Sequence, residues 1–130
     1  MKKSIIIFIT IIPLLCILGC KTTPEEVEQG LPPAEYFKRA QSAVIERNDY
    51  DKALALYQAV LEQYESDRQN GVIAKYEIAF IYYKQEKYDL AKEKFEEILE
   101  IYGEESSAQL PPWPPVLAEK LLVKIEEKTK

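Results

Sequence analysis

The sequence repeats itself at a spacing of 38 residues, and this repeat constrains the fold more than any other feature. Small and large apolar residues return in the same order in both copies. The matched pairs are Tyr50 and Tyr88, Ala53 and Ala91, Tyr57 and Phe95, Val60 and Ile98, and Tyr64 and Tyr102. Within each copy these residues are mostly three or four positions apart, which is the spacing of one face of an α-helix. A fixed period of this kind indicates an array of helical units whose neighbours cover one another's apolar faces.

Each copy is predicted to contain two helices joined by a short polar turn. In the first copy we expect helices over 34–47 and 50–64, with Asp49 as the N-cap of the second. In the second copy we expect a hairpin over 72–102. Its first helix is apolar on nearly every side, so it must be covered by neighbours on several faces.

These positions resemble the tetratricopeptide repeat (TPR) family, whose small and large packing residues match Ile78, Ala79, Tyr82, Tyr83, Tyr88, Ala91, Phe95 and Ile98. The first copy is looser because Gln41 replaces a small residue. The resemblance implies an all-α fold of two antiparallel hairpins over 34–64 and 72–102. The family's usual spacing is about 34 residues, and we place the extra residues in a polar linker over 66–71.

A fifth helix is expected over 115–128, after a loop over 104–115 that ends in two proline pairs around Trp113. Its apolar residues form one stripe that includes Leu121 and Ile125. This pattern is typical of a capping helix that covers the last hairpin. The alternative is that Trp113 or this helix docks on another protein.

The first residues have the layout of a secretory signal, with two lysines followed by an apolar run over 5–18. The run ends in Ile17-Leu18-Gly19-Cys20, which resembles a bacterial lipobox. This resemblance implies that residues 1–19 are removed and that Cys20 is lipidated and anchors the chain to a membrane. The alternative is a signal anchor that stays uncut. Residues 20–33 contain several prolines, and we expect them to form a flexible tether.

The TPR resemblance also implies a concave groove lined by the first helix of each pair. The groove residues expected from it are Lys38, Ile45, Ile73, Tyr76, Phe80, Tyr83 and Lys84. At 100° per residue, Tyr76, Phe80 and Tyr83 fall within about 60° of one another, and aromatic residues of this kind suit a binding surface. The alternative is that the fifth helix covers this aromatic stripe and makes it part of the core.

The composition argues against catalysis, because the chain has no histidine and shows no nucleophile with a supporting base. We therefore expect no enzyme activity, no cofactor and no metal site. The net charge of −5 argues against nucleic acid as a partner.

The two resemblances together imply a lipoprotein adaptor that binds a protein or peptide in the cell envelope. It would be distantly similar to the helical lipoprotein of the outer-membrane β-barrel assembly machinery, and we expect it at the outer membrane, facing the periplasm. The rival hypothesis is a carrier that holds a small hydrophobic ligand between the aromatic stripe and the fifth helix. Two repeats are few for independent stability, so a partner or self-association is expected.

Overall fold

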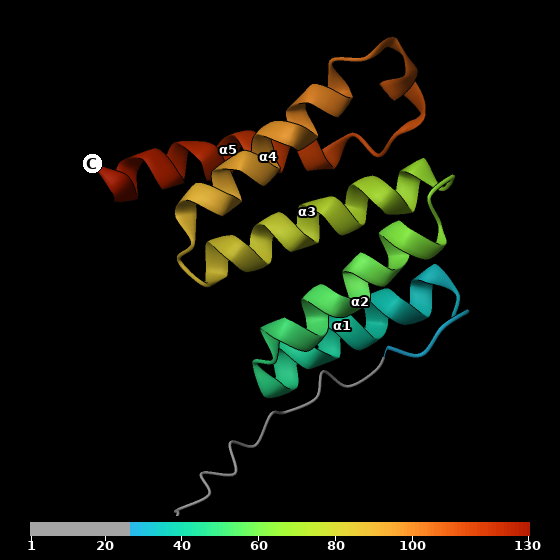
Figure 1. The fold of residues 1–130 in the computed structure, drawn as a ribbon. Helices are drawn as coiled ribbons and strands as arrows, with labels where there is room; N and C mark the ends of the chain where they lie inside the picture. The colour runs from blue at the N-terminus through green and yellow to red at the C-terminus, as the bar shows by residue number, and fades with distance from the viewer. Residues whose placement is uncertain (1–26) are drawn as a thin grey trace, which may run out of the picture.

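The computed structural model describes residues 27–130, and every regular element within them is helical (Figure 1). The elements are α1 (Pro33–Arg47), α2 (Tyr50–Gln63), α3 (Arg68–Lys84), α4 (Tyr88–Tyr102), the short 3₁₀-helix η1 (Glu105–Gln109) and α5 (Trp113–Thr129). The predicted all-α fold, with two hairpins and a fifth helix, is confirmed. The signal over 1–19 and the lipidation site at Cys20 lie outside the described residues.

Within residues 27–130, no helix combines the length and the apolar character needed to cross a membrane.

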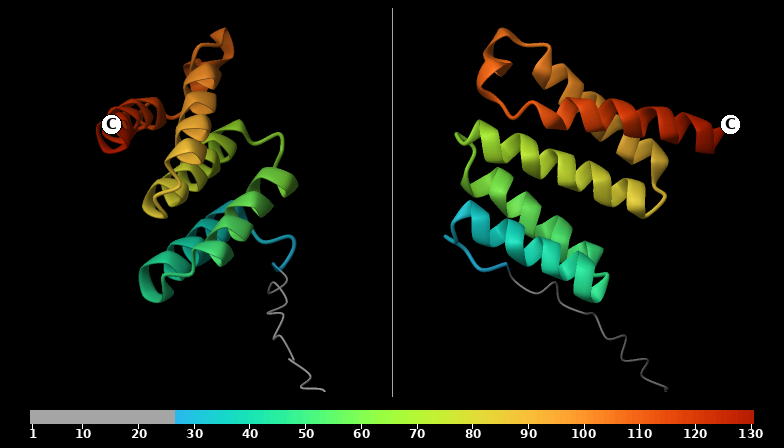
Figure 2. Two further views of the ribbon diagram at one scale, coloured as in Figure 1. Left: turned by 60° about the vertical axis from the view of Figure 1, so that its left-hand side comes forward. Right: turned by 180° about the vertical axis from the view of Figure 1, so that it is seen from behind.

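Each helix packs against the next one along the chain, and α5 also reaches back to contact α3. Seen from behind, in the right-hand view of Figure 2, α1, α3 and α5 follow one another along one side of the molecule, and α5 lies in front of α4. The helix α3 therefore has neighbours on several sides. This arrangement explains why its sequence is apolar around most of its circumference.

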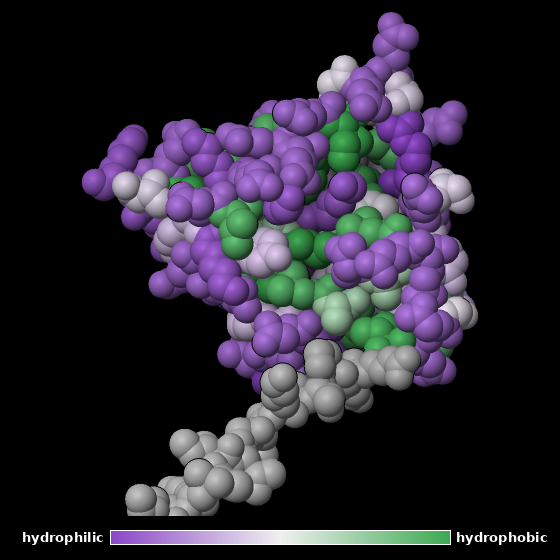
Figure 3. Space-filling model, viewed as in Figure 1, coloured by the Kyte–Doolittle hydropathy of each residue, from purple (hydrophilic) through white to green (hydrophobic). Residues whose placement is uncertain are grey.

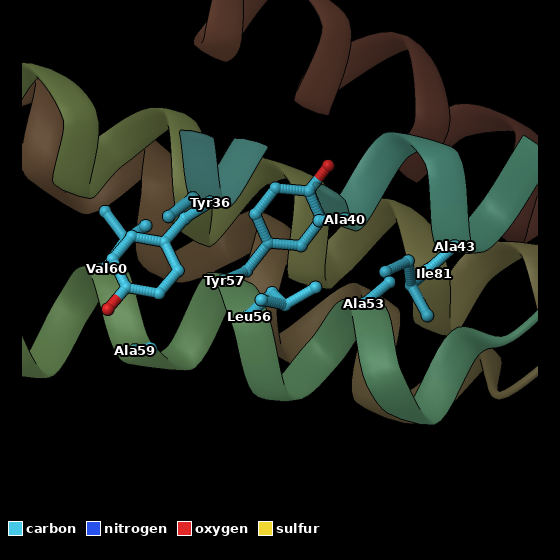
Figure 4. Close-up of a cluster of buried hydrophobic side chains, with 10 residues drawn as sticks. Tyr36, Ala40, Ala43, Ala53, Leu56, Tyr57, Ala59, Val60 and Ile81 are labelled. Carbon is cyan, nitrogen blue, oxygen red and sulfur yellow. The ribbon is translucent and has the colours of Figure 1, made fainter. Parts of the chain in front are cut away.

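Small residues allow the two helices of each hairpin to approach closely. In the first hairpin, Ala40 and Ala43 of α1 and Ala53 of α2 are fully buried, and Tyr57 fills the space beside them (Figure 4). A larger side chain at these positions would push the helix axes apart. In the second hairpin, Ala91 is equally buried, so the small residue of the repeat has the same role in both copies.

The two hairpin turns share one backbone conformation, although their residues differ. Asn48 and Glu86, which are 38 positions apart, both have positive φ, at 54° and 60°. Asp49 then caps α2, because its side chain accepts a hydrogen bond from the backbone N–H of Lys52 at 3.0 Å, as predicted. The equivalent residue before α4 is Lys87, whose side chain makes no capping hydrogen bond. The second turn therefore has poorer local chemistry than the first, because asparagine tolerates this conformation better than glutamate does.

The predicted linker over 66–71 is wrong from residue 68 onward, because α3 already begins at Arg68. Asp67 caps this helix, and its side chain accepts a hydrogen bond from the backbone N–H of Asn70 at 3.1 Å. Part of the extra length of the repeat therefore lies in α3, which has 17 residues against 15 in α1.

The predicted loop over 104–115 also contains more helix than expected. It includes η1, and α5 begins at Trp113. The physical reason is that Pro114 and Pro115 occupy the first turn of α5, where proline removes no needed hydrogen bond and has a suitable φ.

Residues 27–32 lie against the first hairpin, which differs from the free tether expected over 20–33. Val27 and Leu31 pack against its core. The backbone N–H of Gly30 donates to Oε1 of Gln63 at 2.8 Å, and the hydroxyl of Tyr64 donates to the carbonyl of Leu31 at 2.6 Å. Sequence composition alone did not reveal these contacts, because they join residues 33 positions apart. Residues 20–26 lie outside the described part of the chain.

Candidate functional site

A small apolar pocket of about 180 Å³ opens between α1 and α3. It brings together three of the predicted groove residues, namely Ile45 from α1 and Phe80 and Lys84 from α3. The other lining residues are Gln41, Val44, Tyr50, Tyr57, Glu77 and Ile81. The pocket lies between the first helices of the two hairpins, so it is on the face where the groove was expected.

Ile45 gives this pocket an exposed apolar rim. Its side chain is 81% exposed, although it is large and hydrophobic. A single exposed isoleucine is ordinary on a protein surface. Here, however, it adjoins a pocket whose wall includes Val44 and Phe80, so a bound segment would cover a continuous apolar area.

Glu77 is the acidic residue in the lining, and it sits in a partly buried position. Burial raises the pKa of its carboxyl above the ordinary value of 4.5. No hydrogen bond or ion pair reaches this carboxylate from the described residues. Lys84 is seven residues further along the same helix, about 10 Å away along its axis. Glu77 is therefore a partly desolvated carboxylate that forms no hydrogen bond or ion pair with the described residues.

The neighbouring side chains of Tyr57 and Tyr76 carry no charge that would offset the negative charge of Glu77. Burial and, second, the charge of Glu77 raise the pKa of Tyr76 to about 12. The same two causes, in the same order, raise the pKa of Tyr57 still further. Both rings are therefore neutral at neutral pH, and Lys84 is the other charged residue of the pocket lining.

The structure places Tyr76 in the core, where its side chain is only 7% exposed. The ring of Trp113 meets it edge-on, with centroids 5.0 Å apart, and Phe95 lies at 5.9 Å. Trp113 thus fixes the start of α5 on α3. At Tyr76 the structure therefore agrees with the alternative to a groove, in which the fifth helix covers part of the aromatic stripe.

The other predicted groove residues are divided between different surroundings. The ring of Phe80 stacks between those of Tyr76 and Tyr83, and its centroid is 6.2 Å from each of theirs. Ile73 packs in the same cluster. Lys38 lies apart from the pocket, in a hollow of about 380 Å³ that it shares with Arg39. The structure therefore does not bring the seven predicted residues into one continuous groove.

The opposite pair of helices carries a second apolar area. Figure 3 shows hydrophobic surface near the middle of the face on which α2 and α4 lie in front. A hollow there is lined by Leu61, Ile78 and Tyr82, together with the charged Lys94 and Glu97. Because Lys94 and Glu97 form an ion pair, their charges are already matched within the chain.

Sequence reasoning did not single out Glu77, Gln41, Val44 and Tyr57 as residues that line this pocket. A signal for Glu77 was present, because it is the one acidic residue in the apolar segment over 71–83. A carboxylate in such a segment is expensive to bury without a partner. Its direction toward α1 depends on how the two hairpins pack, which the repeat pattern alone does not give.

Antiparallel helix pairs stacked side by side define a helical repeat protein. The tetratricopeptide repeat model matches this chain twice, over residues 36–66 and 74–104. Repeats of this kind are generally protein-interaction modules without catalytic activity.

An uncharacterized protein of Treponema pallidum (strain Nichols) is 31% identical to this chain over 96 residues. The matched region covers 72% of this chain and 38% of the relative, so the chain spans well under half of the relative's length. No solved structure matches the chain.

Proposed function

We propose that this protein is a lipid-anchored adaptor of the bacterial cell envelope that holds a segment of a partner protein against the face formed by α1 and α3. The observation that carries the proposal is the pocket between the two repeats, with Ile45 exposed at its rim and Glu77 unpaired in its wall. Matched tetratricopeptide repeats support a protein as the partner. The lipobox-like residues before Cys20 support the anchor.

The small size of the pocket favours a peptide segment over a carried small molecule. Ligand pockets usually enclose about 300–1,000 Å³, whereas this one encloses about 180 Å³. The space that the carrier hypothesis requires, between the aromatic stripe and α5, is occupied by the contact of Tyr76 with Trp113. An adaptor is therefore the function that the described residues support best.

The anchor is tested by feeding producing cells an alkyne analogue of palmitate. The chain with Cys20 is expected to take up the label, and the Cys20→Ala variant is expected to take up none. Label on both chains, or on neither, would contradict lipidation at Cys20.

The binding face is tested by purifying the anchored chain from intact cells and comparing the proteins that accompany it. Ile45→Asp introduces a charge at the pocket rim, and Val123→Asp introduces the same charge at an exposed apolar residue of α5. We expect Ile45→Asp to lose a specific envelope protein that both the unchanged chain and Val123→Asp retain. Equal retention by both variants would place binding elsewhere.

A further inference from the structure

The pocket between α1 and α3 has a chemical character that narrows the class of segment it binds. Its wall is mostly apolar, and its lining contains one carboxylate, that of Glu77, with no hydrogen bond or ion pair from the described residues. A group that fits such a pocket needs an apolar stem and a positively charged end. Lysine and arginine side chains have this form, since their methylene stems pack on apolar surface while the charged end seeks a partner.

We propose that Glu77 binds a lysine or arginine side chain of the partner segment, with its methylene stem lying against Val44, Ile45 and Phe80. This inference rests on the proposed function, because it names the chemistry that the same face recognises. The volume of about 180 Å³ limits the pocket to one side chain of the segment.

The positive charge of Lys84 determines toward which end of the pocket the charged end of the bound side chain points. Glu77 and Lys84 both line the pocket, and they are separated by two turns of α3. A positive group is therefore attracted toward the Glu77 end and repelled from the Lys84 end. The neighbouring Tyr57 and Tyr76 are neutral, and Gln41 has no charge, so none of them replaces the missing cation.

The burial of Glu77 makes the pairing selective. A carboxylate that is already partly desolvated gains more from a cation than an exposed one does, because the surrounding medium screens the attraction less. The cost of removing water from Glu77 is met when the chain folds, before any partner arrives. An apolar segment without a cation would remove the remaining water from Glu77 without pairing its charge, so it would bind more weakly.

The test uses the full chain, purified in detergent, and a displayed library of random peptides as the probe. Peptides that bind are made synthetically, and each basic residue is replaced in turn by norleucine, which keeps the methylene stem and removes the charge. We expect the bound peptides to share a basic residue whose replacement weakens binding about tenfold or more. The same replacement is expected to have little effect on binding to the Glu77→Gln variant.

Glu100→Gln is the matched control, because it makes the same substitution at an exposed residue of α4, away from the pocket. It should bind the peptides as the unchanged chain does. Circular dichroism of both variants checks that their helices are intact.

Different results would contradict the adaptor function and the role of Glu77. Peptides that bind without a shared basic residue, or whose norleucine replacement costs as much with Glu77→Gln as with the unchanged chain, would overturn the role of Glu77 and leave the adaptor function standing. A library that yields no bound peptide would overturn the proposed function, and the inference would fall with it.

Discussion

The first helices of this array meet at two junctions that differ in how they are filled. Between α3 and α5, Tyr76 and Trp113 are in edge-on contact, and Ala79 of α3 is fully buried. Between α1 and α3, the corresponding junction leaves a pocket with Ile45 at its rim. The contrast shows that α5 closes one side of the second repeat, whereas its other side keeps a pocket.

The two junctions differ because α1 and α3 carry different residues at equivalent positions of the repeat. Tyr76, Ala79 and Tyr83 in α3 correspond, 38 residues earlier, to Lys38, Gln41 and Ile45 in α1. At this junction α3 therefore faces α5 with rings and a small residue that allow close packing. In α1 the same positions carry the charged Lys38, the polar Gln41 and the exposed Ile45, which supply no rings, and a pocket remains at the junction with α3.

The largest expected effect is on the filled junction, where Tyr76→Ala should lower the free energy of unfolding by about 3–5 kcal/mol, since it empties the contact between α3 and α5. Ile45→Ala, at the exposed rim of the open junction, is the control, and it should change stability by no more than about 0.5 kcal/mol. Urea unfolding followed by circular dichroism measures both. Equal losses would mean that the two junctions are alike.

An exchange of residues between equivalent positions sharpens the comparison. Ala79→Gln places the longer side chain of the first repeat into the filled junction and should cost about 1–3 kcal/mol through overpacking. The reverse exchange, Gln41→Ala, should be nearly neutral because position 41 is exposed. Thermal unfolding of the two variants gives the result, and a neutral Ala79→Gln would show that this junction has spare room.

Substitutions in the hairpin turns should have a smaller effect, and they should stabilise the fold rather than destabilise it. Glu86→Gly should raise the free energy of unfolding by about 1 kcal/mol, because glycine adopts positive φ without the steric cost that glutamate has there. The same change at Asn48 should gain less, since asparagine tolerates this conformation better. Denaturant unfolding of the two variants side by side tests the difference, and a greater gain at Asn48 would be inconsistent with it.

The smallest effect concerns the pH dependence of stability. The pKa of Glu77 is raised in the folded chain, so the folded state binds this proton more tightly than the unfolded state does. As the pH rises from about the unfolded value of 4.5 through the raised folded value, this residue lowers the free energy of unfolding, and the loss remains at higher pH. Glu77→Gln should therefore be more stable than the unchanged chain at pH 7.

The comparison near pH 4 provides the control, because Glu77 is then protonated in both states and the advantage of the glutamine variant should shrink. Stability measured across this pH range decides the matter. A glutamine variant that is less stable at pH 7 would mean that the charge of Glu77 is stabilised within the chain.

The repeat pattern predicted most of the fold because small and large residues at fixed spacing determine which helix faces pack. Ala53, Ala91 and Phe95 were placed correctly for this reason. The start of α3 was missed because the Asp67 cap lies in a polar segment that resembles a linker. The start of α5 was missed because the prolines around Trp113 suit both a loop and a first helical turn.

The candidate site was only partly predictable, because it depends on distances between helices from different repeats. The TPR resemblance grouped Ile45, Phe80 and Lys84 on one face, and the structure places all three in the lining of the same pocket. It could not decide whether Tyr76 was exposed, since that depends on where α5 lies. It also passed over Glu77, because its place in the pocket depends on how α1 and α3 pack.

The most direct test of the account places a photoreactive benzoylphenylalanine at Ile45 or at its equivalent, Tyr83, in the anchored chain and irradiates intact cells. The account predicts a covalent adduct with an envelope protein from position 45 and none from position 83, because only the first position lies at an open junction. Adducts from position 83 alone, or equal adducts from both positions, would contradict the claim that the junction between α1 and α3 is where this protein holds its partner.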